Sequence, residues 1–362
     1  MKLLFVGTVR GGGGTESHFV TLSRAMQAEG HSVAAVIRSE SIIQNGLAGS
    51  AVKLYYGTFR NAFDPRGIIA VWHACRDFKP DWIIGNYSKE YWPLAIISRL
   101  LGIKLALFKH MDFPLRFVTH HFIPRLAHRF IVISNFMRAN FIARGLAPER
   151  IQMLYNPLDL SHFHPDAALR KKTRSALGYK DDDVVLGFVG SFHRDKGMFQ
   201  LAESANLAME QLPNLKVLWI GMGPAKEEFV RNIQNNKFAH RHLCQPWSND
   251  VRDYYAAMDI LAIPSVSNEA FGRVSLEGQA CGVPVLCSNR GGIPESLNPG
   301  VTGQLITSGD ILAWRDAIIV LVKDEQLRHF MRNNGPEWVK EKFSSSAIAK
   351  QMTEMLQDLP VN

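Results

Sequence analysis

Short apolar runs alternate with helix-like segments along almost the whole chain, and this alternation constrains the fold more than any other feature. The first run, KLLFVGTV at residues 2–9, is followed by glycines and an amphipathic segment that ends near Gly30. A similar order recurs up to about residue 145 and again after residue 180. Strands that alternate with helices in this way form parallel βαβ units. The sequence therefore predicts an α/β protein with two doubly wound, Rossmann-like domains that face each other across a cleft.

The alternation lapses once, between Asn156 and Leu177, where turn-forming residues and a basic helical segment indicate a linker. We therefore expect an N-terminal domain at residues 1–165 and a C-terminal domain at residues 166–343. The last helical segment, at about 344–362, is expected to pack back on the first domain.

Composition excludes several other classes of protein. Of the 362 residues, 46% are hydrophobic and 20% are charged, as is usual for a globular chain. No stretch approaches the ~20 apolar residues of a membrane span, and the apolar start is too short for a secretory signal. The four cysteines form no CxxC pair, so we expect reduced thiols and a cytoplasmic location.

Positive charge is concentrated in the first half. Residues 1–160 contain 19 basic and 10 acidic residues, a net of +9, whereas the remainder contains 22 and 23, a net of −1. Such an excess favours an anionic partner: lipid headgroups, nucleic acid or a phosphorylated substrate. No RNP-like, KH-like or zinc-finger pattern supports nucleic acid, which we therefore do not expect as a partner.

The segment 113–130, FPLRFVTHHFIPRLAHRF, interleaves phenylalanines with arginines. Aromatic rings that enter the headgroup zone beside arginines that meet anionic lipid would place the protein on the inner face of the cytoplasmic membrane. The alternative is that the phenylalanines belong to the core and the arginines are only solvated. The residues concerned are Phe113, Arg116, Phe117, Phe122, Arg125, Arg129 and Phe130.

Two loops of the first half lie directly after predicted strands, where open α/β sheets bind ligands. The loop Gly11–Glu16 contains four glycines before a helix, so its backbone and the helix N-terminus suit an anion, although a tight structural turn also explains it. His110 follows the predicted strand at 104–109 and is suited to hydrogen bonding with a substrate, although a lone histidine is more often structural.

Three loops of the second half have the same placement. The loop 190–197, GSFHRDKG, brings Arg194 and Lys196 after a strand, where they suit phosphate oxygens unless the turn is merely solvated. The loop 221–224, GMGP, is expected to be mostly structural. In the stretch 268–277, NEAFGRVSLE, Glu269 and Glu277 flank the start of a helix and suit sugar and ribose hydroxyls, unless the helix is simply capped.

No metal site is expected. The run Asp181–Asp183 matches a DxD pattern, but it precedes its strand and so indicates a solvated turn at the edge opposite the expected site. The histidines near residues 120–128 are surrounded by arginines and have no cysteine or carboxylate nearby to complete a metal site.

Taken together, these motifs resemble glycosyltransferase family 4, the retaining nucleotide-sugar transferases of the GT-B fold. The resemblance is carried by Gly13-Gly14-x-Glu16, YNPLDLSHFHP, GSFHRDKG, IGMGP, EAFGRVSLEGQACGVPV and RGGIPE. The block with glutamates eight positions apart and the trailing ACGVPV is its most specific part. Ser191 stands where the family often has arginine, which leaves one diphosphate contact in doubt.

The resemblance implies roles for individual residues. The first domain would bind the acceptor and the second the donor. Lys196 and Arg194 would bind the donor diphosphate, Glu277 the ribose, and Glu269 with the backbone near Phe271 the sugar hydroxyls. His110 would line the reacting face of the sugar. The full set of implied donor-binding residues is Gly13, Gly14, Glu16, Arg194, Lys196, Phe271, Gly272, Arg273, Val274 and Glu277, with His110, Lys196 and Glu269 implied in catalysis.

The reaction implied is retaining, metal-independent transfer of a hexosyl group to a saccharide or lipid-linked acceptor, as in lipopolysaccharide, O-antigen or exopolysaccharide synthesis. No cofactor beyond the donor is expected, and a UDP-sugar is weakly preferred. The alternatives are a nucleotide-sugar epimerase or a phosphorylase on the same fold, and an inactive scaffold. The retention of Lys196 and Glu277 argues against the inactive scaffold.

Overall fold

The computed structural model describes residues 1–248 and 250–358, which divide into two compact units. Unit 1 comprises Met1–Asp159 together with the described residues from Phe343 onward, and unit 2 comprises Leu160–Lys342. The division thus falls six residues before the position 165/166 placed from the sequence. Positions 359–362 of the expected last helix lie outside the described residues. Each unit is considered by itself below.

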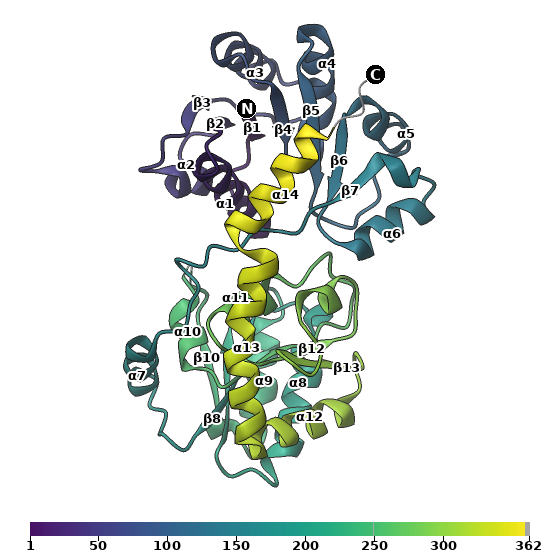
Figure 1. Cartoon of the computed structure of the whole chain (residues 1–362). Coiled ribbons are helices and arrows are strands. Elements are labelled where there is room, and N and C mark those ends of the chain that lie inside the picture. Colours follow the sequence, from purple (N-terminus) through teal and green to yellow (C-terminus); the bar gives the residue numbers. More distant parts are fainter. Residues whose placement is uncertain (249, 359–362) are drawn as a thin grey trace. The chain divides into compact units, whose positions relative to one another are not determined.

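Unit 1 is built on a seven-stranded sheet of order β3-β2-β1-β4-β5-β6-β7, in which every neighbouring pair is parallel (Figure 1). The strands are β1 Lys2–Gly7, β2 Ser32–Ile37, β3 Lys53–Tyr56, β4 Trp82–Gly85, β5 Lys104–Lys109, β6 Arg129–Val132 and β7 Ile151–Met153. Their near-continuous apolar sequences fit a parallel sheet that is covered on both faces.

The helices of unit 1 connect these strands. They are α1 Gly14–Ala28, α2 Ile42–Leu47, α3 Pro65–Phe78, α4 Tyr91–Leu101, α5 Phe117–Leu126, α6 Asn135–Ala143 and, from the end of the chain, α14 Ser345–Gln357. Local chemistry sets several starts: Ser41, Asp64 and Ser134 cap α2, α3 and α6 through side-chain oxygens that accept backbone N–H bonds.

Helix α14 packs against α1 and completes unit 1 (Figure 1). His31 Nε2 lies 2.8 Å from Thr353 Oγ1, and Arg129 Nε donates to the carbonyl oxygen of Met355 at 2.9 Å. The last helix begins at Ser345, because Ser344 separates it from α13 and caps it with its side chain. The buried face of α14 consists of Ile348, Ala349, Met352 and Leu356.

Unit 2 repeats the architecture with a six-stranded parallel sheet of order β10-β9-β8-β11-β12-β13. Its strands are β8 Val184–Val189, β9 Leu215–Ile220, β10 His242–Gln245, β11 Ile260–Ile263, β12 Val285–Ser288 and β13 Gly303–Ile306. Its helices are α7 Ala167–Ala176, α8 Met198–Met209, α9 Lys226–Gln234, α10 Arg252–Ala257, α11 Arg273–Ala280, α12 Ile311–Lys323 and α13 Glu325–Phe343.

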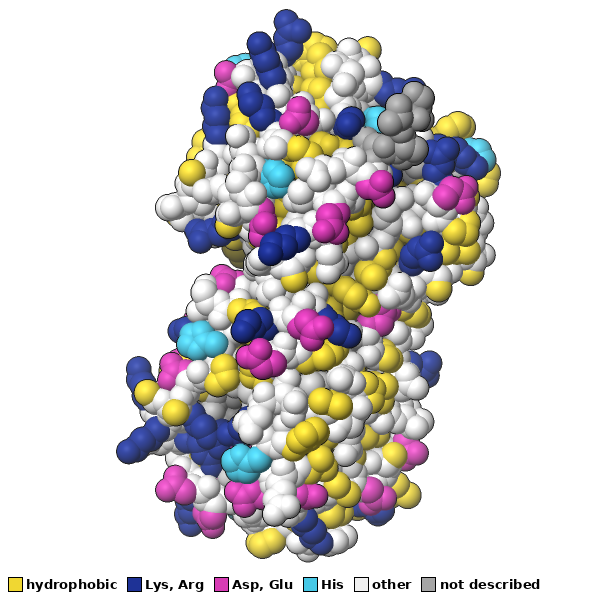
Figure 2. Space-filling view, in the orientation of Figure 1, with side chains coloured by type: hydrophobic (Ala, Val, Ile, Leu, Met, Phe, Trp, Pro, Cys, Tyr) yellow, Lys and Arg dark blue, Asp and Glu magenta, His cyan; other side chains and the backbone are white. Residues whose placement is uncertain are grey.

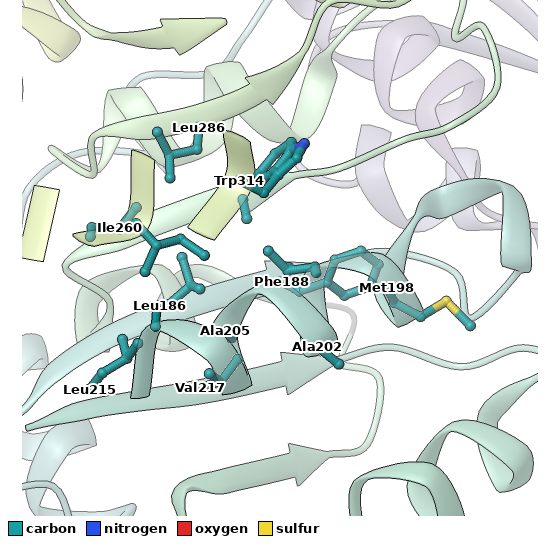
Figure 3. Close-up of a cluster of buried hydrophobic side chains, with 14 of the residues drawn as sticks. Leu186, Phe188, Met198, Ala202, Ala205, Leu215, Val217, Ile260, Leu286 and Trp314 are labelled. Atoms are coloured by element: carbon teal, nitrogen blue, oxygen red, sulfur yellow. The ribbon is translucent and has the colours of Figure 1, made fainter. Parts of the chain in front are cut away.

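The core of unit 2 lies between the sheet and the layer of α8, α9 and α12. Figure 3 shows side chains of the central strands, among them Leu186, Phe188 and Ile260, facing Ala202 and Ala205 of α8. The small residues of α8 let this helix approach the sheet closely. Burial of each large apolar side chain of this kind stabilises the fold by about 1.5–3 kcal/mol.

Strand order reverses once in each sheet, between β1 and β4 in unit 1 and between β8 and β11 in unit 2. In open α/β sheets the loops at such a switch point diverge and leave a crevice beyond the carboxyl ends of the strands. The α/β, doubly wound architecture predicted from the sequence is thus confirmed. It directs attention to the loops after β1, β4, β8 and β11.

Candidate active site

In unit 2, the loops that follow β8 and β11 meet because these strands are neighbours. Lys196 Nζ of the first loop lies 3.0 Å from Glu269 Oε1 of the second, and both side chains are half-buried. The hydroxyl of Ser265 also donates to Glu269, and the amide of Val266 donates to the carbonyl oxygen of Asp195 at 2.9 Å. Two residues that the sequence selected separately are therefore an ion pair.

Two glycines allow this close approach. Gly197 has a φ of +72°, and a Cβ at this position would lie 1.9 Å from the carbonyl oxygen of Pro264. Gly291 has a φ of +57°, and a Cβ there would lie 2.5 Å from the amide nitrogen of Glu269. Both positions require glycine for conformation and for space. The GSFHRDKG and RGGIPE motifs thus fix the backbone around the Lys196–Glu269 pair.

Glu277 lies one turn into α11 and is only 8% exposed. Its carboxylate accepts hydrogen bonds from the Tyr255 hydroxyl at 2.9 Å and from Arg273 Nε at 2.8 Å. Burial, together with the charge of Glu277, raises the pKa of Tyr255 well above its ordinary value, so this hydroxyl stays a donor. Glu277 is therefore held in one orientation, with its charge balanced by Arg273.

The start of α11 is not capped by a side chain. Gly272 is its N-cap, and a Cβ on Gly272 would lie 2.2 Å from Ser296 Oγ, so this glycine is required by packing. Phe271 is buried next to it, and Arg273 and Val274 form the first turn, whose backbone N–H groups have no intrahelical partner. The positive end of this helix is thus well suited to an anion.

Arg194 makes different contacts from those of Lys196. Its guanidinium pairs with Glu228 of α9 and lies over the Phe199 ring at 4.9 Å, and its side chain is 68% exposed. Among the described residues, its recorded partners do not include Glu269 or Glu277. A role for Arg194 at a diphosphate stays a prediction, and it requires the side chain to leave Glu228.

In unit 1, His110 follows β5 and packs against two other rings. Its imidazole stacks on Phe108 with ring centroids 5.7 Å apart and meets the edge of His18 at 4.6 Å. Burial, assisted by the charge of Lys109, lowers the pKa of His110 to about 3, so the ring is neutral. Its Nε2 lies 3.3 Å from Asn86 Oδ1, which leaves Nδ1 as an acceptor that has no partner among the described residues.

The glycine loop of unit 1 ends at α1, which begins at Gly14 with Gly13 as an N-cap that lacks a side chain. Glu16 is buried in the first turn and accepts a hydrogen bond from the Tyr87 hydroxyl at 3.0 Å. A side-chain contact thus joins the first turn of α1 to the loop after β4.

A buried carboxyl group lies behind this contact. Glu90 Oε1 accepts hydrogen bonds from the Thr8 amide at 2.9 Å and from the Thr8 hydroxyl at 2.7 Å. Burial raises the pKa of Glu90 to about 7, although the bonds from Thr8 favour the ionised form. Burial at this place therefore favours the neutral form of Glu90.

Several residues of this candidate site were missed from the sequence. They are Thr8, His18, Asn86, Tyr87 and Glu90 in unit 1, and Tyr255 and Ser265 in unit 2. A position at the carboxyl end of an apolar run was an available signal for Thr8, Asn86, Tyr87 and Ser265, which follow β1, β4 and β11. For Tyr255 and His18, nothing in the sequence indicates that the side chain reaches the site.

Two family models match the chain and together cover most of it. The model of Glycosyltransferase Family 4 matches residues 12–162, and that of Glycosyl transferases group 1 matches residues 170–338. The chain belongs to glycosyltransferase family 4. The resemblance drawn from the motifs is confirmed, and so is the class of enzyme: this family 4 protein is a glycosyltransferase of the GT-B fold.

Individual relatives agree with this assignment. The capsular polysaccharide biosynthesis glycosyltransferase CapM of Staphylococcus aureus is 29% identical over 275 residues, 73% of this chain and 70% of CapM. A D-inositol 3-phosphate glycosyltransferase of Corynebacterium urealyticum is 32% identical over 223 residues, 58% of this chain and 52% of that protein. The match thus spans about half the length of the latter relative.

Among solved structures, HepE of Anabaena in complex with UDP and glucose is similar to this glycosyltransferase with a TM-score of 0.83. Sequence identity is 22%, and the likeness covers 99% of this chain and 100% of that one. At this identity the likeness shows the shared fold.

The structure corrects part of the segment expected to meet lipid. Phe113 and Phe117 of the family 4 chain are 65% and 85% exposed, but Phe130 is fully buried in β6. Arg129 is bonded to carbonyl oxygens at the end of α14 and so belongs to the internal structure of unit 1. The exposed part is confined to α5 and the loop before it, where Figure 2 shows hydrophobic, basic and histidine side chains side by side.

The DxD run also differs from its expectation as a solvated turn. Asp181 and Asp182 are exposed, but Asp183 is buried, accepts the Lys180 amide at 2.8 Å and lies 3.9 Å from Lys216 Nζ. Its carboxylate therefore closes the turn before β8. Within residues 1–248 and 250–358, no group of three or more His, Cys, Asp or Glu side chains is arranged to hold a metal ion.

Proposed function

We propose that this enzyme transfers a hexosyl group from a nucleoside diphosphate sugar, with retention, to a saccharide or lipid-linked acceptor of a bacterial surface polysaccharide. The proposal rests mainly on the Lys196–Glu269 ion pair beside the start of α11, which no side chain caps. UDP is the preferred nucleotide of the donor, a choice supported by HepE, which is solved with UDP and glucose. The pathway is supported by CapM, which is named for capsular polysaccharide biosynthesis.

In this proposal the leaving diphosphate enters between Lys196 and the first turn of α11. The ammonium group exchanges Glu269 for the phosphate oxygens and stabilises the negative charge that grows as the sugar C1–O bond breaks. Glu269, once released, accepts hydrogen bonds from sugar hydroxyls, and Glu277 accepts them from the ribose. The pre-existing ion pair holds both side chains in position before the donor binds.

The family resemblance supplies the remaining step. The acceptor hydroxyl attacks C1 from the side that the diphosphate leaves, and its proton passes to an oxygen of the departing phosphate. A new C1–O bond forms as the old one breaks, so the configuration is retained. Nδ1 of His110, a neutral acceptor, suits a sugar hydroxyl on the reacting face better than it suits a phosphate.

The decisive experiment incubates the enzyme with UDP-, GDP- and ADP-sugars and follows release of the nucleoside diphosphate with and without oligosaccharide or lipid-linked acceptors. We expect release that depends on the acceptor and a product anomer, identified by NMR, that matches the donor. An altered nucleotide sugar formed without acceptor would instead indicate an epimerase. A reaction that requires orthophosphate would indicate a phosphorylase.

We further propose that transfer needs no divalent metal ion, because Lys196 and the α11 N-terminus supply the positive charge at the diphosphate. The initial rate should be the same, within about twofold, in EDTA and in Mg²⁺ or Mn²⁺. Loss of transfer in EDTA that Mn²⁺ restores would overturn this part of the proposal.

We also propose peripheral association with the inner face of the cytoplasmic membrane, through α5 and its preceding loop. Within residues 1–248 and 250–358, no helix is long and apolar enough to span a bilayer. Flotation with liposomes should be stronger with anionic lipid and should fall in salt. A Phe113→Ser/Phe117→Ser variant should float less and still release nucleotide from its donor. Equal flotation of wild type and variant would reject the membrane contact and leave the transferase proposal intact.

A further inference from the structure

A basic hollow lies at the amino ends of strands β5, β6 and β7 in unit 1, the edge opposite the loops described above. Its volume is about 940 Å³. Lys104 and Arg129 open β5 and β6, and Arg150 directly precedes β7. Arg99 of α4 and Arg125 of α5 complete the cationic lining.

These cations have no anionic partners among the described residues. Within 1–248 and 250–358, none of the five forms an ion pair, and the single carboxylate of the lining, that of Glu149, forms none either. Arg125 Nη1 and Arg129 Nε donate to backbone carbonyl oxygens, and Lys104 Nζ lies 5.6 Å above the Trp82 ring. Their positive charges therefore remain unneutralised.

The His128 side chain lies within this excess of positive charge. The ring lies in the lining, and its Nδ1 accepts the Leu105 amide at 3.1 Å. Burial lowers the pKa of His128, and the charges of Lys104, Arg99 and Arg129 lower it further. Lys104, Arg99 and Arg129 line the hollow together with this ring, so three cations from two strand starts and one helix surround the same space.

We propose that this hollow is a binding site for a phosphate-bearing anion, separate from the nucleotide site and independent of the transferase proposal. Guanidinium groups bind phosphate through paired, charge-assisted hydrogen bonds, and several arginines around a concavity can hold more than one phosphate oxygen. A hollow favours a compact phosphate or diphosphate over a flat protein surface.

The surroundings suggest two sources for that phosphate. The two helices that contribute Arg99 and Arg125 also carry exposed apolar side chains, Ile96 and Leu100 on α4 and Phe122 on α5. A lipid headgroup would use both the cations and these apolar side chains, whereas a free phosphate or diphosphate would use the cations alone.

The test measures calorimetric binding of inorganic pyrophosphate to the full chain at low salt. A Lys196→Ala background removes the proposed diphosphate contact of unit 2, so a failure of that proposal does not affect this measurement. Adding Arg99→Ala, Lys104→Ala and Arg150→Ala should weaken binding at least ~10-fold, since charge-assisted bonds to phosphate are lost.

The matched control removes three cations from elsewhere: Lys171→Ala, Lys172→Ala and Arg231→Ala, on α7 and α9. These side chains are exposed and form no ion pair among the described residues. Figure 2 shows basic side chains over α7 on this face. The control should retain the affinity of its parent within about twofold. Equal weakening by both triple variants, or no binding by the parent, would overturn the proposal.

A second measurement does not depend on the variants. With histidine labelled for NMR and the His128 signal assigned through His128→Gln, pyrophosphate should shift the His128 resonance and leave His329 unchanged. Binding that leaves the His128 signal in place would also overturn the proposal.

Vesicles distinguish the two sources. Stronger binding to vesicles with phosphatidylglycerol than to phosphatidylcholine alone, reversed by pyrophosphate and lost in the Arg99/Lys104/Arg150 variant, would support the site and assign it to a lipid headgroup. Binding of pyrophosphate without this vesicle effect would support the site and assign it to a soluble phosphate.

Discussion

The two units share one architecture but treat charge in opposite ways at the carboxyl ends of their strands. In unit 2, Lys196 and Glu269 form an ion pair, and Glu277 is paired with Arg273. In unit 1, burial shifts the pKa of His110 to about 3, which favours its neutral form. The site edge of unit 2 is thus suited to a charged ligand such as a diphosphate, and that of unit 1 to neutral hydroxyl groups.

The amino ends of the strands show the reverse arrangement. In unit 2, Arg170, Arg174 and Arg332 all pair with Asp259, at 2.6, 3.0 and 3.3 Å. These arginines fasten α7 and α13 to the start of β11. In unit 1, the cations of the hollow have no such carboxylate among the described residues. Arginine in the same part of the same architecture therefore serves internal structure in one unit and is open to a ligand in the other.

The largest expected effect tests the internal role in unit 2. Asp259→Asn leaves three buried or half-buried arginines without their counter-ion and should reduce the free energy of unfolding by about 3–5 kcal/mol. Urea denaturation followed by circular dichroism measures this. Glu210→Gln, which breaks an exposed 2.9 Å pair with Lys237, is the control and should cost less than about 1 kcal/mol. Equal costs would mean that the arginine cluster does not hold the helices.

The next effect concerns the charged site. Lys196→Ala should lower turnover at least ~100-fold, because the loss of one preorganised charge at a leaving group costs about 3 kcal/mol. Glu277→Ala should cause a similar loss. Steady-state rates of nucleoside diphosphate release measure both, with Lys237→Ala as a surface control of equal charge change. Near wild-type turnover in a folded Lys196→Ala variant would remove the basis for assigning unit 2 to the donor.

A pH-dependent effect tests the neutral character of unit 1. The pKa of Glu90 rises from 4.5 to about 7 on folding, because of burial. Below pH 4.5 the carboxyl is protonated in both states. Between pH 4.5 and 7 only the unfolded chain loses the proton, so stability falls by up to about 3 kcal/mol as pH rises.

Glu90→Gln removes this titration while it keeps an acceptor for Thr8. The difference in unfolding free energy between variant and wild type should therefore move in favour of the variant from pH 4.5 to 7 and change little above that. Urea titrations at several pH values provide the measurement. A difference that is independent of pH would show that Glu90 is ionised in the folded protein.

The smallest effect concerns Arg194. Glu228→Ala frees this exposed arginine and should change stability by less than about 1 kcal/mol. If Arg194 binds the donor diphosphate, the same variant should lower the KM for the donor, because the competing partner is gone. An unchanged KM would leave Lys196 as the diphosphate contact of this loop.

The sequence predicted the sheets and the loops at their carboxyl ends because apolar periodicity and glycine position are local properties. It also singled out Lys196 and Glu269, but not that they touch, since 73 positions separate them. The hydroxyl of Tyr255 on Glu277 was unpredictable for the same reason. Such contacts depend on which strands become neighbours.

The errors have a similar origin. Phe130 has the same apolar side chain as Phe117, but it lies in β6 between two neighbours, and the sequence of the segment does not separate the two environments. Asp183 was grouped with two exposed aspartates, although its carboxylate is buried and accepts a hydrogen bond from the Lys180 amide. For residues next to a predicted strand boundary, the type of side chain alone thus does not predict whether the residue is buried or exposed.

The position of α14 has a consequence for how the protein is made. A ribosome delivers residues in order, so the strands of unit 1 emerge first, but the helix that covers α1 emerges after all of unit 2. At about 5–20 residues per second, the interval between Asp159 and Gln357 is roughly 10 to 40 s. Throughout this time the surface that receives Ile348, Met352 and Leu356 is bare, whereas unit 2 is continuous in the chain. Unit 1, which is synthesised first, is therefore completed last. It is the unit whose bare apolar surface most needs to be protected by chaperones during translation.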